Sequence, residues 1–166
     1  MRKVKREVKI GNLTIGGNHP VAVQTMLCVP IKDIEGNVAQ AKQVAEAGCQ
    51  ILRASVPSLE DVRVVDAVKS AVDIPFVADI HFDYRIALAC VDAGADKIRI
   101  NPGNIGSNEK IRTVVDCAKE RNIPIRVGVN SGSLEKDLIA KYGGHVTAEG
   151  IVESALDKVH LIEDMG

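Results

Sequence analysis

Two stretches of this chain repeat one another and indicate its fold: AGCQILR at residues 47–53 and AGADKIR at residues 93–99. A second pair, DIPFV at residues 73–77 and NIPIR at residues 122–126, lies at a similar offset. In each member a Gly or Pro separates a helical stretch from an apolar run, as where a helix ends just before a strand. The offsets, 46 and 49 residues, suit two strand–helix units per repeat. This spacing favours a closed barrel over an open doubly wound sheet.

Outward from these repeats, apolar runs alternate with amphipathic stretches along the whole chain, which predicts βαβ units and a parallel sheet. The turn signal Gly11-Asn12 within residues 4–16 predicts a β-hairpin that closes one end of the domain. No G-x-G-x-x-G follows the first strand, which counts against a Rossmann fold. We predict strands at 21–26, 50–55, 76–80, 97–101 and 125–130, and helices at 37–47, 59–71, 84–93, 108–121 and 147–164.

The predicted fold class is therefore α/β, an incomplete (β/α)8 TIM-type barrel. A complete barrel typically needs about 250 residues, whereas these 166 residues supply about five strand–helix units and the hairpin. We expect residues 1–166 to be the N-terminal part of a TIM-barrel substrate-binding domain. The missing units would lie outside this sequence or come from a partner chain.

Composition narrows the classes of partner. The net charge is −1, aromatic residues make up 2% and Trp is absent, so binding to nucleic acid is poorly supported. No apolar run could span a bilayer, and no apolar segment follows the basic start, so we expect a cytoplasmic protein. The four cysteines are too scattered for a disulfide framework or a zinc site. We predict that Cys49, Cys90 and Cys117 are core residues, and the role of Cys28 stays open.

Each predicted strand carries polar residues near its carboxyl end, although buried barrel strands should be apolar. Within a strand these residues lie two or four positions apart, so they share one face. Residues of the opposite parity are mostly apolar, as packing against helices requires. The polar residues should therefore face the mouth of the barrel, where TIM-barrel active sites lie: Gln24, Arg53, Ser55, Asp79, His81, Arg99, Asn101, Arg126 and Asn130.

Three of these residues are arginines, which would repel one another unless an anion joined them. The planar guanidinium group suits phosphate and carboxylate oxygens. NPGNIG at residues 101–106 follows the fourth strand and precedes a helix, so its glycines allow a backbone nest and its helix start offers N–H groups. The pattern predicts a phosphorylated or diphosphorylated small-molecule ligand.

Plainer roles stay open for the single residues. A strand-end arginine is often only a salt-bridge partner, Asp79 could pair with Arg53 or Arg99, and His81 could be structural. Asp79 and His81 could also be metal ligands, but two ligands are a weak signal and we predict no metal site. The joint pattern favours a ligand site, because core packing does not explain polar residues on one face of five strands.

Longer stretches resemble the bacterial 4-hydroxy-3-methylbut-2-enyl diphosphate synthases. The resemblance rests on VADIHFDYR at residues 77–85, RINPGNIG at 99–106 and RVGVNSGS at 126–133, with VQTM at 23–26 and Gly16-Gly17 of the hairpin. It covers essentially the whole chain. It implies a reductase of the non-mevalonate isoprenoid pathway, which opens 2-C-methyl-D-erythritol 2,4-cyclodiphosphate to the linear allylic diphosphate with loss of water.

The resemblance also implies an architecture. Members of this family have an N-terminal TIM barrel that binds the diphosphate and a C-terminal domain with a 4Fe-4S cluster, held by three cysteines and a glutamate. Electrons come from flavodoxin or ferredoxin. The proteins are homodimers in which the cluster domain of one subunit covers the barrel of the other.

Carried over by position, the resemblance implies that Arg53, Arg99 and Arg126 hold the diphosphate. Asn101, Asn130 and His81 would complete the pocket, and Asp79 would orient His81 or an arginine. We assign no catalytic residue in this chain, and Asp79 and His81 are the candidates for such a role.

Two departures from the family pattern matter. LCVPIKD at residues 27–33 replaces a Thr/Asn-rich loop of many members, and none of the four cysteines matches a cluster ligand. We therefore expect the iron–sulfur domain and its ligands to lie outside this chain, and the chain alone to be catalytically inactive.

Two other functions compete with this one. A pterin-binding transferase barrel of the dihydropteroate synthase type would bind pterin or aminobenzoate instead of the cyclic diphosphate. A non-catalytic phosphometabolite-binding barrel fragment would assemble with another chain, which sedimentation would detect.

Overall fold

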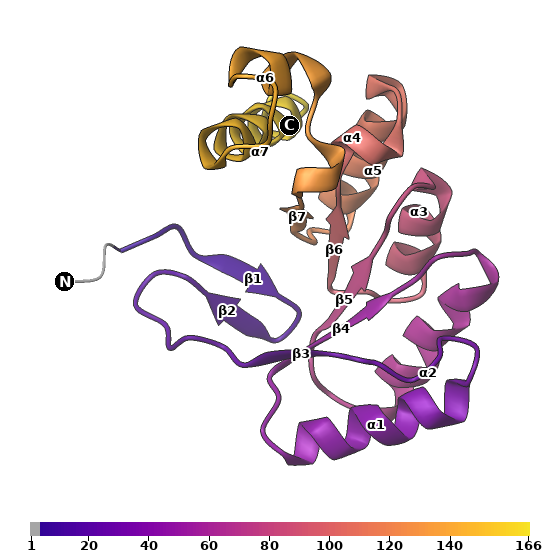
Figure 1. Cartoon of the computed structure of the whole chain (residues 1–166). Helices are drawn as coiled ribbons and strands as arrows, with labels where there is room; N and C mark the ends of the chain where they lie inside the picture. Colours follow the sequence, from indigo (N-terminus) through magenta and orange to yellow (C-terminus); the bar gives the residue numbers. More distant parts are fainter. Residues whose placement is uncertain (1–3) are drawn as a thin grey trace.

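The computed structural model describes residues 4–166, which form a parallel sheet covered on one side by helices and on the other by a hairpin (Figure 1). The strands are β1 (Val8–Ile10), β2 (Leu13–Ile15), β3 (Gln24–Met26), β4 (Ile51–Ser55), β5 (Phe76–Asp79), β6 (Lys97–Ile100) and β7 (Ile125–Val127). The helices are α1 (Ile34–Glu46), α2 (Arg63–Ala71), α3 (Tyr84–Asp92), α4 (Pro102–Ile105), α5 (Asn108–Glu120), α6 (Lys136–Lys141) and α7 (Ala148–Glu163), with 3-10 turns η1 (Glu60–Val62) and η2 (Ser131–Ser133).

The five strands β3 to β7 pair in sequence order, and every pair is parallel. Each crossover contains a helix, which is the βαβ pattern that the alternating sequence predicts. The strands form the wall of a TIM-type barrel that does not close within the described residues, so β3 and β7 are its two edges. The predicted α/β fold class and its five units are confirmed.

Alternation along the strands builds two separate cores. Every second residue along the strands packs against the helices and belongs to the larger cluster, as Leu52, Phe76 and Ile98 do. The residues between them face the barrel interior, where Ile51 and Val77 pack against Ile10 of the hairpin. The interior is apolar only near the amino ends of the strands, which leaves their carboxyl ends free to carry polar groups.

The hairpin β1–β2 is confirmed, and its turn lies against the amino end of β6. Gly11 adopts the left-handed conformation (φ 55°), and a side chain there would collide with Asp96. Asp96 accepts hydrogen bonds from the Lys69 ammonium and from the backbone N–H of Phe76, both at 2.7 Å. One carboxylate thus joins the hairpin turn, α2, β5 and β6.

Replacing Asp96 with alanine should lower the free energy of unfolding by about 2 kcal/mol, because the buried N–H of Phe76 loses its acceptor. Urea unfolding of the chain measures this change. Asp116→Ala is the matched control, since Asp116 is exposed on α5, and it should change stability by no more than about 0.5 kcal/mol. Equal effects of the two substitutions would contradict the role of Asp96.

Several predicted boundaries are wrong. The first strand begins at Gln24 and not at 21, because β3 is an edge strand and Val21 and Val23 are exposed. The first helix begins three residues earlier than predicted, since the Asp33 side chain accepts a hydrogen bond from the Gly36 N–H and caps it. The last strand ends at Val127 instead of 130.

Two short helices also differ from the prediction. Residues 102–105, predicted as a glycine-rich loop, form the single turn α4, with Pro102 in its first turn. Residues Lys136–Lys141 form the short helix α6, in a stretch between the predicted helices 108–121 and 147–164.

Candidate functional site

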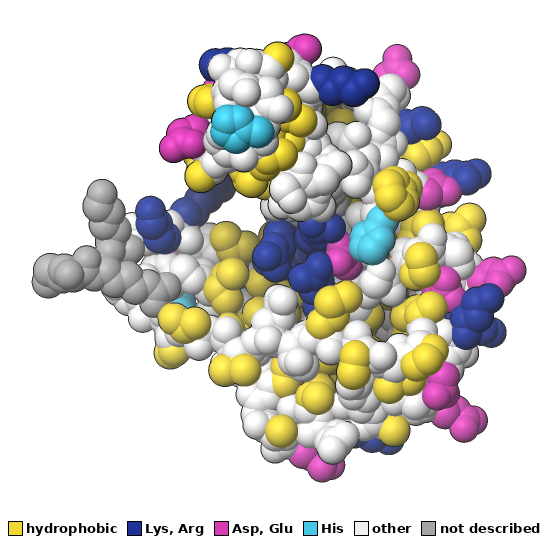
Figure 2. All heavy atoms as spheres, in the orientation of Figure 1, with side chains coloured by type: hydrophobic (Ala, Val, Ile, Leu, Met, Phe, Trp, Pro, Cys, Tyr) yellow, Lys and Arg dark blue, Asp and Glu magenta, His cyan; other side chains and the backbone are white. Residues whose placement is uncertain are grey.

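The register of the sheet brings the predicted polar residues onto one face. Ser55 is the Cα partner of Asp79, Asp79 of Arg99, and Arg99 of Arg126. Residues paired in this way on neighbouring parallel strands point to the same side of a sheet. Figure 2 shows Lys and Arg side chains gathered in the middle of the open face, beside acidic and histidine side chains. The predicted row at the carboxyl ends of β4 to β7 therefore exists.

Asp79 is the centre of this row. Its side chain is only 2% exposed, so its charge must be neutralised by neighbours. One oxygen, Oδ2, accepts hydrogen bonds from Nε of Arg53 at 3.2 Å and from its Nη2. The other, Oδ1, accepts from Nη1 of Arg99 at 3.0 Å. Asp79 therefore pairs with both arginines and fixes their orientation.

The two arginines keep part of their hydrogen-bonding capacity. A guanidinium group has five N–H donors, of which Asp79 takes two from Arg53 and one from Arg99. Their side chains are 23% and 17% exposed. Arginines held in this way can bind an anion without a large loss of side-chain entropy.

The pKa of Asp79 reflects this arrangement. Burial raises the pKa, but hydrogen bonds and charges from Arg53 and Arg99 outweigh burial and hold it below the ordinary value of 3.8. Because the folded-state pKa is depressed, the ionised carboxylate stabilises the fold above the unfolded-state pKa. That contribution is lost as the pH falls through the lower, folded-state value.

We expect the free energy of unfolding to fall below about pH 4, and part of this loss to come from Asp79. Urea unfolding between pH 7 and pH 2.5 measures the slope. In Asp79→Asn the curve should be flatter below pH 4, because the amide does not titrate. Parallel curves for the two proteins would show that Asp79 does not contribute.

His81 lies beside the Asp79 carboxylate but forms no hydrogen bond with it. Its Nε2 is 3.7 Å from Oδ2 of Asp79, beyond hydrogen-bond distance, and its side chain is 43% exposed. The edge of its ring meets the exposed Phe82, with ring centroids 6.1 Å apart. His81 therefore lies next to Asp79 with part of its ring exposed.

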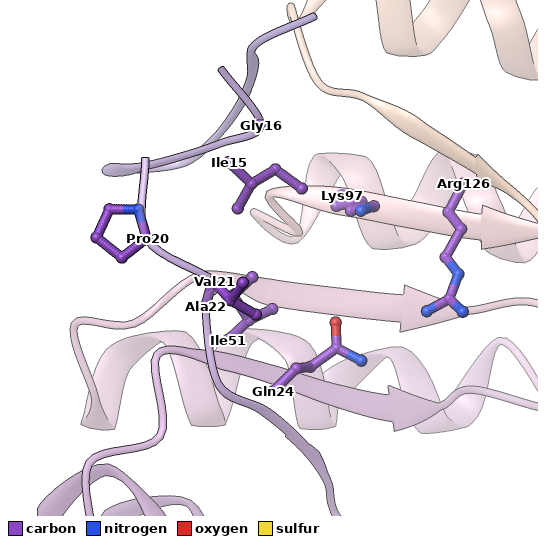
Figure 3. A pocket seen from close by; sticks show the side chains of 9 residues that line it. All are labelled: Ile15, Gly16, Pro20, Val21, Ala22, Gln24, Ile51, Lys97 and Arg126. Carbon is purple, nitrogen blue, oxygen red and sulfur yellow. The ribbon is translucent and has the colours of Figure 1, made fainter. Parts of the chain in front are cut away.

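Arg126 is exposed and lies at the edge of a cavity of about 440 Å³. The cavity is lined by the end of the hairpin, by the segment that leads into β3 and by residues of β4, β6 and β7, and Figure 3 shows Gln24 and Arg126 pointing toward one another across it. Lys97, which the sequence analysis did not select, also lines the cavity. Burial and the charge of Arg126 lower the pKa of Lys97. The sequence does contain a signal for Lys97: it lies two residues before Arg99 in the same strand, so the two side chains point to the same face of the sheet.

The side chain of Asn101 is buried and already hydrogen-bonded, whereas that of Asn130 is accessible to a ligand. Asn101 is 1% exposed, and its Oδ1 accepts a hydrogen bond from the Gly103 N–H at 3.1 Å. Its Nδ2 donates to Ser133 Oγ at 2.8 Å. Asn101 thus caps α4 and ties it to the turn after β7, whereas the Asn130 side chain is exposed at the start of η2.

The predicted backbone nest in residues 101–106 is not formed. The N–H groups of Gly103 and Asn104 bond to the side chain and the carbonyl of Asn101, at 3.1 and 2.9 Å. Residues 102–105 form the single turn α4, and the helix predicted to follow them is α5, which begins at Asn108. The arginines, and not this loop, are the cationic part of the site.

The cysteines lie apart from this row. Cys49 and Cys90 are buried, and burial raises the pKa of Cys90 to about 12, as in a core thiol. Cys117 is half-buried, and the Cys28 thiol is exposed and accepts a hydrogen bond from Gln40. Within residues 4–166 no three potential metal ligands converge, and no helix is both long and apolar enough to cross a membrane.

Comparison with known families gives a match over residues 5–166 to the family described as the GcpE TIM-barrel domain. The chain is 54% identical, over its whole length, to the 4-hydroxy-3-methylbut-2-en-1-yl diphosphate synthase (flavodoxin) of Caldanaerobacter subterraneus subsp. tengcongensis, and covers 46% of that protein. It is 52% identical over 164 residues to the synthases of the same name from Halalkalibacterium halodurans and Listeria monocytogenes, covering 44% of each. The chain thus spans about half the length of the curated relatives it matches.

Solved structures with a similar fold include dihydropteroate synthases. The enzyme from Xanthomonas albilineans in complex with 7,8-dihydropteroate has a TM-score of 0.66 at 17% identity, over 97% of this chain and 62% of that chain. The enzyme from Yersinia pestis has a TM-score of 0.59 at 17% identity, over 89% of this chain and 58% of that one. At this identity the likeness concerns the fold alone.

Proposed function

Because this chain belongs to the GcpE TIM-barrel family, we propose that it is the diphosphate-binding part of a 4-hydroxy-3-methylbut-2-enyl diphosphate synthase. The substrate of that reductase is 2-C-methyl-D-erythritol 2,4-cyclodiphosphate. The observation that carries the proposal is the pairing of one buried carboxylate, Asp79, with two arginines that retain free N–H groups.

The geometry supports a role for each residue. Arg53 and Arg99 would bind the diphosphate oxygens with the N–H groups that Asp79 leaves free. Arg126 lies next to Arg99 in the sheet and would bind from the side of β7. His81 and Asn130, both with solvent-accessible side chains, would contact the ligand at the rim of the site. Asp79 would orient the arginines, and Asn101 would act indirectly by holding the loop.

The side chains at the carboxyl ends of the strands suit a small anionic ligand. Three guanidinium groups on one face repel one another, and Asp79 neutralises only one positive charge. A diphosphate would neutralise the remaining charge through hydrogen bonds that are stronger than those between neutral groups. His81, near both Asp79 and the opening, is the side chain placed to exchange a proton with a bound ligand.

The redox part of the reaction requires a 4Fe-4S cluster in the intact protein, and the residues of this chain do not fit one. Cys49 and Cys90 are buried in the core, and within residues 4–166 no three ligating side chains converge. We propose that the cluster ligands lie outside this chain, and that the chain alone binds substrate without turning it over.

The electron donor and the assembly are also proposals. The names of the relatives specify flavodoxin, and we propose flavodoxin, or a ferredoxin in its place, as donor to the intact enzyme. A homodimer in the cytoplasm is what family membership implies. Neither the donor nor the second subunit is needed for the binding that we assign to this chain.

Thermal unfolding with a panel of ligands tests the proposed function against its alternatives. The cyclic diphosphate should raise the midpoint, and 7,8-dihydropteroate and 4-aminobenzoate should leave it unchanged, because only a ligand that binds the folded state stabilises it. Stabilisation by the pterin or the aminobenzoate would instead favour a transferase. Equal stabilisation by many phosphorylated metabolites would favour a general phosphometabolite-binding fragment.

A further inference from the structure

Gly128 follows β7 and is buried, at a position where its backbone does not require glycine. Its N–H donates to the carbonyl of Ile100 at 2.8 Å, which continues the pairing of β7 with β6. Its φ lies outside the left-handed range that other glycines of this chain adopt. The usual conformational reason for a glycine is therefore missing here.

The reason lies in the space above its Cα. A Cβ built on Gly128 would lie under 3.0 Å from Nε, Cζ and Nη2 of Arg99. The guanidinium group of Arg99 thus occupies the space beside the Gly128 Cα, where a side chain would lie. Its remaining nitrogen, Nη1, donates to Asp79 on β5 at 3.0 Å. The position of Arg99 therefore depends on two strands: Asp79 on β5 binds its guanidinium group, and Gly128 after β7 leaves space for it.

We infer that Gly128 is a positioning residue for Arg99. Because Gly128 has no side chain, the guanidinium group of Arg99 can take the position in which it meets a phosphoryl ligand. The inference rests on the proposed function, since it specifies how the anion site is shaped. A methyl group at residue 128 would displace the guanidinium from this position and away from Asp79. Loss of ligand affinity then follows although every charged residue is retained.

The chain offers a matched control in Gly132, four residues further on. Its φ is likewise outside the left-handed range, and a Cβ there would meet only Asn130 Oδ1, at the ordinary contact distance of 3.6 Å. Gly132→Ala therefore makes the same chemical change in the same loop without touching Arg99.

Two measurements on Gly128→Ala, Gly132→Ala and their combinations with Arg99→Ala test the inference. Urea unfolding without ligand should show a lower midpoint for Gly128→Ala in the wild-type background. In the Arg99→Ala background, where the space is free, the same substitution should have no effect. Titration with inorganic pyrophosphate and with the cyclic diphosphate, at a temperature where all variants are folded, should show at least a tenfold loss of affinity for Gly128→Ala. No further loss is expected in the Arg99→Ala background, and none for Gly132→Ala.

The unfolding and binding results for these variants either support or overturn the positioning role of Gly128. The same loss of stability in both backgrounds would mean that Gly128 serves the backbone, and would overturn the inference. If Gly128→Ala does not fold but the double variant does, the steric link to Arg99 is supported. If the unfolding data show the link but the wild-type chain binds neither ligand, the proposed function fails, and with it the ligand role of Gly128. Unchanged affinity in Gly128→Ala, beside a weakened Arg99→Ala, would overturn positioning alone.

Discussion

Asp79→Ala should lower the free energy of unfolding by about 2–4 kcal/mol, the largest loss expected from any single substitution in the site. Removing the carboxylate leaves two guanidinium groups, of Arg53 and Arg99, side by side without their common partner. Breaking a fully buried ion pair costs about 3–5 kcal/mol. The range here is lower because both arginines are partly exposed and water screens their charges. Urea unfolding at pH 7 measures the loss.

Asp92→Ala is the control for this prediction. Asp92 also pairs with an arginine, Arg121, at 2.8 Å, but both side chains are more than half exposed. Its removal should change stability by less than about 1 kcal/mol. If the Asp79 and Asp92 substitutions have the same small effect, the carboxylate at the end of β5 is not the electrostatic centre of the site.

Arg99→Ala should weaken binding of the cyclic diphosphate about 30-fold or more, which corresponds to about 2 kcal/mol for a lost charge-assisted hydrogen bond. Arg99→Lys should not restore the affinity. A lysine carries the charge, but its single ammonium group cannot both bind Asp79 and fill the space beside Gly128 as the planar guanidinium does. Titration calorimetry with the folded chain and both variants measures the difference.

A surface arginine provides the control for charge alone. Arg121→Ala removes the same positive charge at the end of α5, where Arg121 is exposed and pairs with Asp92 instead of Asp79. Its affinity for the ligand should equal that of the wild-type chain. An equal loss for Arg99→Ala and Arg121→Ala would mean that net charge, and not the site, draws the ligand.

The sequence predicts the sheet and the row of polar residues well because both depend on short-range periodicity. Arg53 and Asp79 could be placed on one face from their parity alone, and the parallel order of the strands follows from the helices between them. The register that makes Arg99 a neighbour of both Asp79 and Arg126 supports that placement.

Features that depend on contacts between distant residues were missed. The tie between α4 and the turn after β7 depends on a hydrogen bond from Asn101 to Ser133, 32 residues away. The role of Gly128 depends on the side-chain conformation of Arg99, 29 residues before it. Such details follow from three-dimensional packing, which overrides local preference.

The most direct test of the diphosphate site is a crystal structure of this chain with the cyclic diphosphate bound. Phosphate oxygens should lie within hydrogen-bond distance of Arg53, Arg99 and Arg126, at the carboxyl ends of β4, β6 and β7. A ligand bound instead between the hairpin and the amino ends of the strands, or no bound ligand at saturating concentration, would contradict the assignment of the site.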